Sequence, residues 1–126
     1  MASAKPFRLG PLALTTTMTT NILNPGTTTG GINSGSGDSL FILLRHIRIV
    51  NKTASAATFS LWLGATGANA AGTELIGTGL SVAANSPFDW YAGSPGLLLQ
   101  VADFLVGGAG TTTALTIEAE GEIGIR

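Results

Sequence analysis

The stretch LFILLRHIRIVN, from Leu40 to Asn51, decides the fold class. Successive side chains of a strand point to opposite faces. One face would therefore carry Phe41, Leu43, Ile47 and Ile49, with Arg45 as the exception. The other face is also apolar until His46. A strand that is apolar on both faces is typical of the covered centre of a sheet. We therefore predict a central strand here.

The end of the chain shows the clearest alternation of apolar and polar residues. In the segment Thr113–Arg126 one face would carry Leu115, Ile117, Ala119, Ile123 and Ile125. The opposite face would carry Thr116, Glu118, Glu120 and Glu122. This period of two predicts a long strand with one buried face.

Further short strand candidates are separated by turn residues, and 18 glycines interrupt any helical periodicity. One of them, Thr58–Leu63, follows Leu40–Asn51 after a short connection, which predicts an antiparallel hairpin of these two strands. Seven to nine short strands predict an all-β fold, a single-domain antiparallel β-sandwich or small barrel, jelly-roll-like. The pattern leaves the wiring of the strands open.

The N-terminal residues are predicted to differ from the rest of the chain. We predict an extended N-terminal arm over residues 1–11, because Pro6 and Pro11 prevent a regular helix there. Such an arm either frays or docks on a neighbouring subunit, and in the second case its contacts would be Phe7, Arg8 and Leu9. Residues 12–126 would form the single domain, with a strand over Leu12–Leu23 and a long Gly/Ser/Thr loop over residues 24–39.

The composition limits the classes of partner. Only 10% of the residues are charged, the formal net charge is −1, and there is no cysteine. The surface must therefore consist largely of Thr, Ser, Asn, Gly and Ala. This predicts a chain that neighbouring subunits cover, and a weakly charged monomer is the alternative. Without a basic surplus we expect no nucleic-acid partner, and without an apolar run of about 20 residues we expect no membrane span. We also expect no signal peptide at the N-terminus.

Catalytic and metal-binding patterns are weak. The single histidine, His46, lies within a predicted strand, and no GxSxG nucleophile elbow occurs. Glu118, Glu120 and Glu122 could act as paired glycosidase carboxylates, but we favour them as ion-pair partners of Arg45, Arg48 or Lys52 on a neighbouring strand. One histidine without cysteine does not make a zinc site. We expect no enzyme, no metal and no cofactor.

Three aromatic residues suggest a contact surface. Trp62, Trp90 and Tyr91 would lie in the core or at a subunit contact, where aromatic side chains are enriched. The alternative is a stacking platform for a sugar, which would make the chain a glycan-binding module.

Several short motifs over residues 40–125 resemble those of small virion-associated proteins of tailed bacteriophages. The motifs are IRIVNKT, ATFSLWLGATG, VAANSPFDWY, ADFL and EGEI. The resemblance implies a structural β-sandwich of the virion, assembled in the bacterial cytoplasm and bound to the major capsid protein or other virion subunits. On this basis we expect a capsid decoration or cement protein that is a homo-oligomer, with a trimer favoured. A tail or neck accessory protein and a glycan-binding host-attachment module are the alternatives.

Overall fold

The computed structural model describes residues 3–25, 40–67 and 69–125. These ranges contain nine strands and no α-helix, which confirms the all-β prediction. No helix in them is long and apolar enough to cross a membrane. The strands are β1 (Ser3–Ala13), β2 (Asn21–Leu23), β3 (Leu40–Asn51), β4 (Ala57–Gly64), β5 (Leu80–Val82), β6 (Ser86–Tyr91), β7 (Leu97–Gln100), β8 (Phe104–Ala109) and β9 (Leu115–Ile125).

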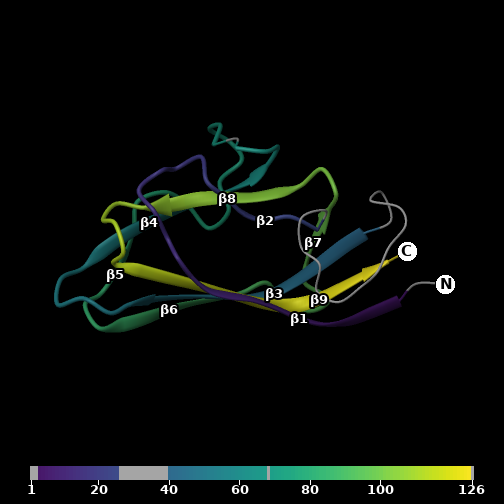
Figure 1. Cartoon of the computed structure of the whole chain (residues 1–126), viewed down its shortest axis with the longest axis horizontal. Coiled ribbons are helices and arrows are strands. Elements are labelled where there is room, and N and C mark those ends of the chain that lie inside the picture. Colours follow the sequence, from purple (N-terminus) through teal and green to yellow (C-terminus); the bar gives the residue numbers. More distant parts are fainter. Residues whose placement is uncertain (1–2, 26–39, 68, 126) are drawn as a thin grey trace.

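The strands form two stacked antiparallel sheets, a sandwich (Figure 1). The first sheet has the order β1-β9-β3-β6, and the second has the order β2-β8-β4-β5. β7 and β6 pair one after the other with the same edge of β3, β7 with residues 41–44 and β6 with residues 46–51. If β6 and β7 are taken as one interrupted strand, the order in both sheets is that of a jelly roll.

β3 is the central strand of the first sheet, as predicted, because β9 lies on one side of it and β6 and β7 on the other. The predicted faces of β3 are wrong beyond Arg45. A β-bulge between Leu44 and His46 inserts Arg45 as an extra residue opposite β9. Ile42 and Leu44 therefore point into the core before the bulge, and Ile47 and Ile49 point into it afterwards; all four are completely buried. The bulge explains why an arginine interrupts an apolar run.

Gly121 of β9 allows the bulge to form. Gly121 lies opposite Leu44, and a Cβ atom at Gly121 would collide with the carbonyl oxygen of Leu43. The apolar face of β9 keeps its predicted alternation around this glycine, since Leu115, Ile117, Ala119 and Ile123 are buried. The side chain of Ile125 lies outside the described residues.

The predicted hairpin of β3 and β4 is wrong, because the two strands belong to different sheets. Both edges of β3 are already occupied in the first sheet, so the chain turns at Asn51 into the second layer. The buried Asn51 amide holds this corner: its Nδ2 donates to the carbonyl oxygens of Ser55 and Val82, and its Oδ1 accepts from the amide and the hydroxyl of Thr53.

The predicted separate arm is also wrong for residues 3–11. These residues are extended, but they belong to β1, which pairs with β9 along most of its length. Phe7 is only 8% exposed and is part of the core between the sheets. The predicted strand Leu12–Leu23 is broken, because residues 14–20 belong to no strand and connect β1 of the first sheet to β2 of the second. Residues 26–39 of the predicted loop lie outside the described residues.

Candidate functional site

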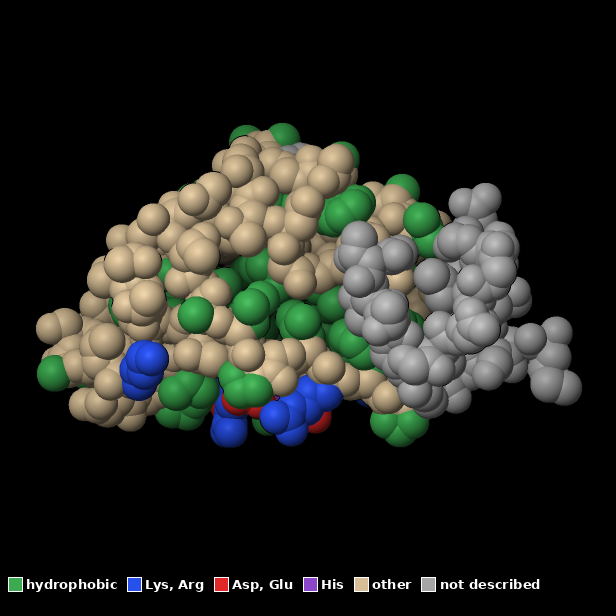
Figure 2. All heavy atoms as spheres, in the orientation of Figure 1, with side chains coloured by type: hydrophobic (Ala, Val, Ile, Leu, Met, Phe, Trp, Pro, Cys, Tyr) green, Lys and Arg blue, Asp and Glu red, His purple; other side chains and the backbone are tan. Residues whose placement is uncertain are grey.

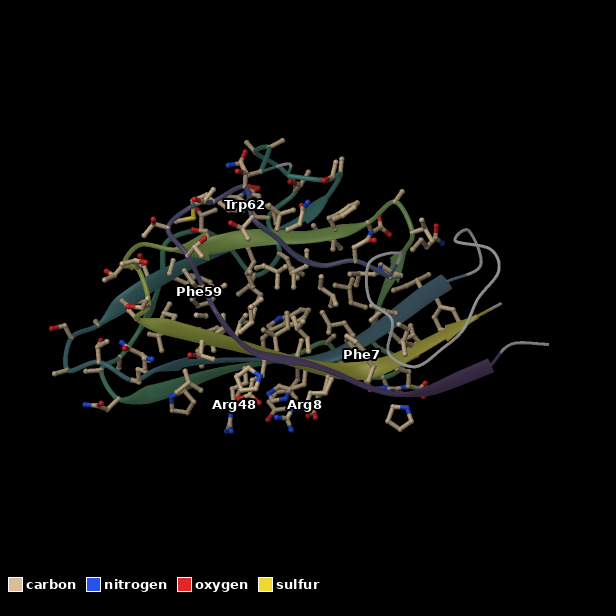
Figure 3. The ribbon with its side chains drawn as sticks, in the orientation of Figure 1. Phe7, Arg8, Arg48, Phe59 and Trp62 are labelled. Atoms are coloured by element: carbon tan, nitrogen blue, oxygen red, sulfur yellow. The ribbon has the colours of Figure 1, made fainter. Side chains whose placement is uncertain are left out.

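The two outer sides of the sandwich differ in chemistry. Of the chain's six basic and seven acidic residues, three arginines and four carboxylates gather on the outer side of the first sheet. Figure 2 shows the blue and red side chains along this lower side, and Figure 3 shows Arg8 and Arg48 pointing away from the core there. We call this surface the charged face. It comprises Arg8, Arg45, His46, Arg48, Asp89, Tyr91, Glu118, Glu120 and Glu122.

Charges of one sign run along each strand of the charged face and alternate from strand to strand. β1 contributes Arg8, β9 contributes three glutamates, β3 contributes two arginines and His46, and β6 contributes Asp89. The registers Arg8↔Glu120 and Glu118↔Arg48↔Asp89 place opposite charges on neighbouring strands. Opposite charges at such cross-strand positions stabilise a sheet by up to about 1 kcal/mol per pair.

His46 is held at the centre of the charged face. Its Nε2 lies 2.7 Å from Asp89 Oδ1, and its Nδ1 lies 3.2 Å from Glu120 Oε1. The Tyr91 ring stacks on the imidazole with 4.4 Å between ring centroids and an interplanar angle of 7°. Both ring nitrogens therefore face carboxylates, and the ring is oriented from the side as well. This arrangement positions His46 without directing it at a hydroxyl nucleophile in the described part of the chain.

Asp89 connects His46 to Arg48. The Nε of Arg48 donates to Asp89 Oδ1 at 3.0 Å. The hydrogen bonds from His46 and then from Arg48 lower the pKa of Asp89, because both stabilise the carboxylate. The same hydrogen bond to Asp89, together with the carboxylate charge, raises the pKa of Arg48. The cluster is therefore a fixed network of donors and acceptors on an accessible surface.

The preferred interpretation of the glutamates as ion-pair partners is confirmed for Glu122, which lies 3.2 Å from the guanidinium of Arg45. Glu118 lies opposite Arg48 in the sheet, and its carboxylate is 4.0 Å from Arg8. The pairing with Arg8 was missed because Arg8 was assigned to an arm. The role of Asp89 was missed too, although its alternation with Phe88 and Trp90 places it on the outer side of a strand.

A shallow pocket of about 160 Å³ lies on β9 between the arginines of β1 and β3. It is lined by Arg8, His46, Arg48, Glu118, Ala119 and Glu120. A second pocket of about 230 Å³ continues it along β9 and is lined by Pro6, Phe7, Arg45, Glu120 and Gly121. Across the described ranges, no three His, Cys, Asp or Glu side chains are grouped so that they could hold a metal ion.

The outer side of the second sheet is covered by two loops. The crown, as we call it, consists of residues 15–20 and of residues 65–67 and 69–79. Both segments rise above β8 in Figure 1, and the second returns along the free edge of β4, where residues 73–77 hydrogen-bond to Leu61 and Leu63. The amide of Asn21 ties the two segments together: its Nδ2 donates to Thr66 Oγ1 at 2.8 Å, and its Oδ1 accepts from the Gly67 amide at 2.7 Å. Beneath the crown lie Trp62, which is 8% exposed, and its cross-strand partner Val106, which is completely buried. Figure 3 places Trp62 on this upper side, away from the core residue Phe59.

The crown presents an almost uncharged surface. Glu74 is the one charged residue in its sequence, and both of its carboxylate oxygens accept from the Gly72 amide, at 2.7 and 3.0 Å. The threonines of residues 15–20 form hydrogen bonds within their own loop. Thr20 Oγ1 donates to the Thr17 carbonyl oxygen at 2.7 Å and lies 3.2 Å from Thr15 Oγ1. The exposed residues of the crown are mainly Thr, Ala, Gly and Asn.

The structure separates the residues that the sequence suggested as subunit contacts. Phe7 is buried, and Leu9 and Trp90 are half-buried against the core. Trp62 lies beneath the crown, so the three aromatic residues do not form one stacking platform. Arg8 and Tyr91 are both exposed on the charged face, Tyr91 at 70%, with Glu120 and His46 between them in the same cross-strand row.

Comparisons with known proteins do not assign the chain to a family. No protein-family model matches it, and a search of curated proteins finds no significant match.

Proposed function

We propose that this chain is a non-enzymatic structural protein of a tailed-bacteriophage virion, a capsid decoration or cement protein that binds adjacent capsid subunits. The motifs between residues 40 and 125 that resemble small phage virion proteins support the proposal. The jelly-roll strand order is compatible with it, because this architecture recurs in viral capsid domains. Since one fold serves many functions, the function depends on the surfaces of the molecule and not on the strand order alone.

The observation that carries the proposal is the separation of charge between the two outer sides. Interface centres are depleted of charged residues, and the crown has this composition. Glu74 is the one charged residue of the crown and accepts a hydrogen bond from the Gly72 amide, and the exposed residues include uncharged threonines such as Thr16 and Thr19. We therefore propose that the crown is the surface that contacts the capsid. The N-terminal residues are not the contact in this proposal, because β1 is part of the sandwich.

A tail or neck accessory protein would use the same surface chemistry, and the number of copies per particle distinguishes it from a decoration protein. The three aromatic residues do not support a glycan-binding role, because Trp62 is buried, Trp90 is half-buried and only Tyr91 is well exposed.

The test is the copy number of the chain in purified phage particles, measured by quantitative mass spectrometry against the major capsid protein. A ratio near one, or a simple fraction of one, is expected for a decoration protein. A few to a dozen copies per particle would instead indicate the neck or tail. Complete absence from the particles would contradict a virion role.

A further inference from the structure

The alternation of charge from strand to strand makes the charged face complementary to itself. Across the first sheet the order β1-β9-β3-β6 carries basic, acidic, basic and acidic side chains. Each strand thus presents one column of side chains, and the four columns alternate in sign. If a second copy faces this sheet with its columns in the reverse order, every basic column of one copy lies opposite an acidic column of the other. The centre of this reversal lies between β9 and β3.

We propose that a second copy of this chain binds the charged face, about a two-fold axis that runs parallel to the strands between β9 and β3. This rotation keeps each cross-strand row at the same height and reverses the order of the columns. Glu118 then faces Arg48 of the second copy, and Glu120 faces His46 of the second copy. Arg8 faces the column of Asp89 and Tyr91, where the exposed Tyr91 ring offers a partner for a guanidinium. Such an interface is isologous, as most dimer interfaces are.

The charges exclude the other face-to-face arrangement. A two-fold axis perpendicular to the strands would leave the columns in their order, so glutamates would face glutamates and arginines would face arginines. Like charges brought together at an interface are strongly unfavourable. The charge pattern therefore selects one dimer geometry, and it favours a dimer over the trimer expected from the sequence.

The size of the face is sufficient for a stable contact. The sheet is four strands wide, with β6 and β7 sharing the fourth position, and its strands lie about 4.8 Å apart along about 36 Å. This face presents roughly 700 Å² per copy, so the total buried area is roughly 1,400 Å², within the range of standard interfaces. Within each copy the charged face holds three arginines and four carboxylates, and these already form ion pairs with one another. Glu118 and Arg48 would each gain a second opposite neighbour in the dimer, so the association should weaken as salt screens the exposed pairs.

This dimer would present its two crowns in opposite directions, one on each outer side. If the crown contacts the capsid, which rests on the proposed function, the dimer is a bivalent bridge between neighbouring capsid subunits. The dimer itself does not depend on that role. A failure of self-association is therefore distinguishable from a failure of the virion proposal, because the first is measured on the purified chain and the second on particles.

The test is sedimentation velocity of the purified chain from about 1 to about 100 μM, at low and at high salt. We expect a dimer whose Kd rises by about tenfold or more between roughly 20 mM and roughly 500 mM NaCl. Arg48→Glu and Glu118→Arg should each raise the Kd by at least about tenfold, because each places like charges opposite each other at two symmetric positions. An equimolar mixture of the two variants should form a heterodimer with an affinity near that of the wild type.

Matched controls carry the same charge changes away from the charged face. Lys52→Glu lies in the β3–β4 connection and Glu74→Lys lies in the crown, and both should dimerise like the wild type. Three results would overturn the proposal. These are a chain that is monomeric at all salt concentrations, a trimer, and a dimer whose Kd changes neither with salt nor in the two variants of the charged face. If a charge-face variant does not fold by circular dichroism, the salt dependence of the wild type still decides.

Discussion

On the outer side of the first sheet, charged side chains meet the solvent directly, whereas on the outer side of the second sheet two loops lie between the strands and the solvent. The charged face is held by cross-strand pairs such as Arg48 with Asp89, which remain accessible. The crown instead buries Trp62 and Val106, so it adds a small apolar layer outside the main core. The comparison teaches that one side is stabilised by electrostatics, which contribute little at exposed sites, and the other by burial, which contributes much more.

The largest expected difference is between two aromatic residues. Trp62→Ala should lower the free energy of unfolding by about 3–5 kcal/mol, because it empties the space beneath the crown. Tyr91→Ala should cost about 1 kcal/mol or less, since Tyr91 is exposed and loses mainly its stacking on His46. Urea unfolding followed by circular dichroism measures both. Equal losses would contradict the assignment of Trp62 to a buried layer.

The second prediction concerns the bulge that shapes the charged face. Gly121→Ala should destabilise the fold by about 1–3 kcal/mol, because its Cβ would overlap the backbone beside the bulge. Gly64→Ala is the matched control, since open space surrounds the position of its Cβ at the end of β4. Thermal unfolding of the two variants gives the comparison. A neutral Gly121→Ala would mean that β3 and β9 approach less closely than described.

The third prediction is a pH dependence of the charged face. The pKa of Asp89 is lowered in the folded chain, so Asp89 stabilises the fold above its ordinary pKa of about 3.9. This contribution is lost as the pH falls from that value through the lowered pKa of the folded state. The stability advantage of the wild type over Asp89→Asn should therefore be largest near neutral pH and shrink below about pH 4.

Urea unfolding of the wild type and Asp89→Asn at neutral pH and at about pH 3 measures this advantage. An advantage that stays constant between the two pH values would show that Asp89 acts through its shape and not through its charge.

The smallest expected effect is that of the exposed pair of Arg8 and Glu118, whose charged groups are 4.0 Å apart. Arg8→Ala should change the free energy of unfolding by less than about 0.5 kcal/mol. The adjacent substitution Phe7→Ala, on the core side of the same strand, should cost about 3–5 kcal/mol. Chemical denaturation of the two variants compares the outer and inner sides of β1. A large loss for Arg8→Ala would mean that the charged face stabilises the fold more than exposed pairs normally do.

The period of two predicted β3 and β9 well, because burial on one face leaves a direct record in alternating residues. The predicted faces of β3 were wrong beyond Arg45, since a bulge adds a residue without any local sign except a misplaced charge. The hairpin of β3 and β4 was wrong because both edges of β3 are taken by strands distant in sequence. The proline-containing β1 was read as an arm, although prolines are tolerated at the edge of a sheet.

The candidate surfaces were less predictable than the fold. Glu118, Glu120 and Glu122 were recognisable as one face of a strand, but their arginine partners depend on the order of strands in the sheet. The crown depends on contacts between residues about 45 positions apart, such as Asn21 with Thr66. No local pattern encodes such contacts, so the covering of Trp62 could not be predicted.

Rebinding of purified variants to capsids lacking the chain is the most direct test of the proposal that the crown, and not the charged face, binds the capsid. Thr16→Lys and Thr19→Lys introduce a charge on the crown, and Ser55→Lys introduces the same charge at an exposed position in the β3–β4 connection, which belongs to neither the crown nor the charged face. After co-sedimentation with capsids, we predict that both crown variants are lost from the capsid fraction while Ser55→Lys remains bound. Retained binding of both crown variants would contradict the account.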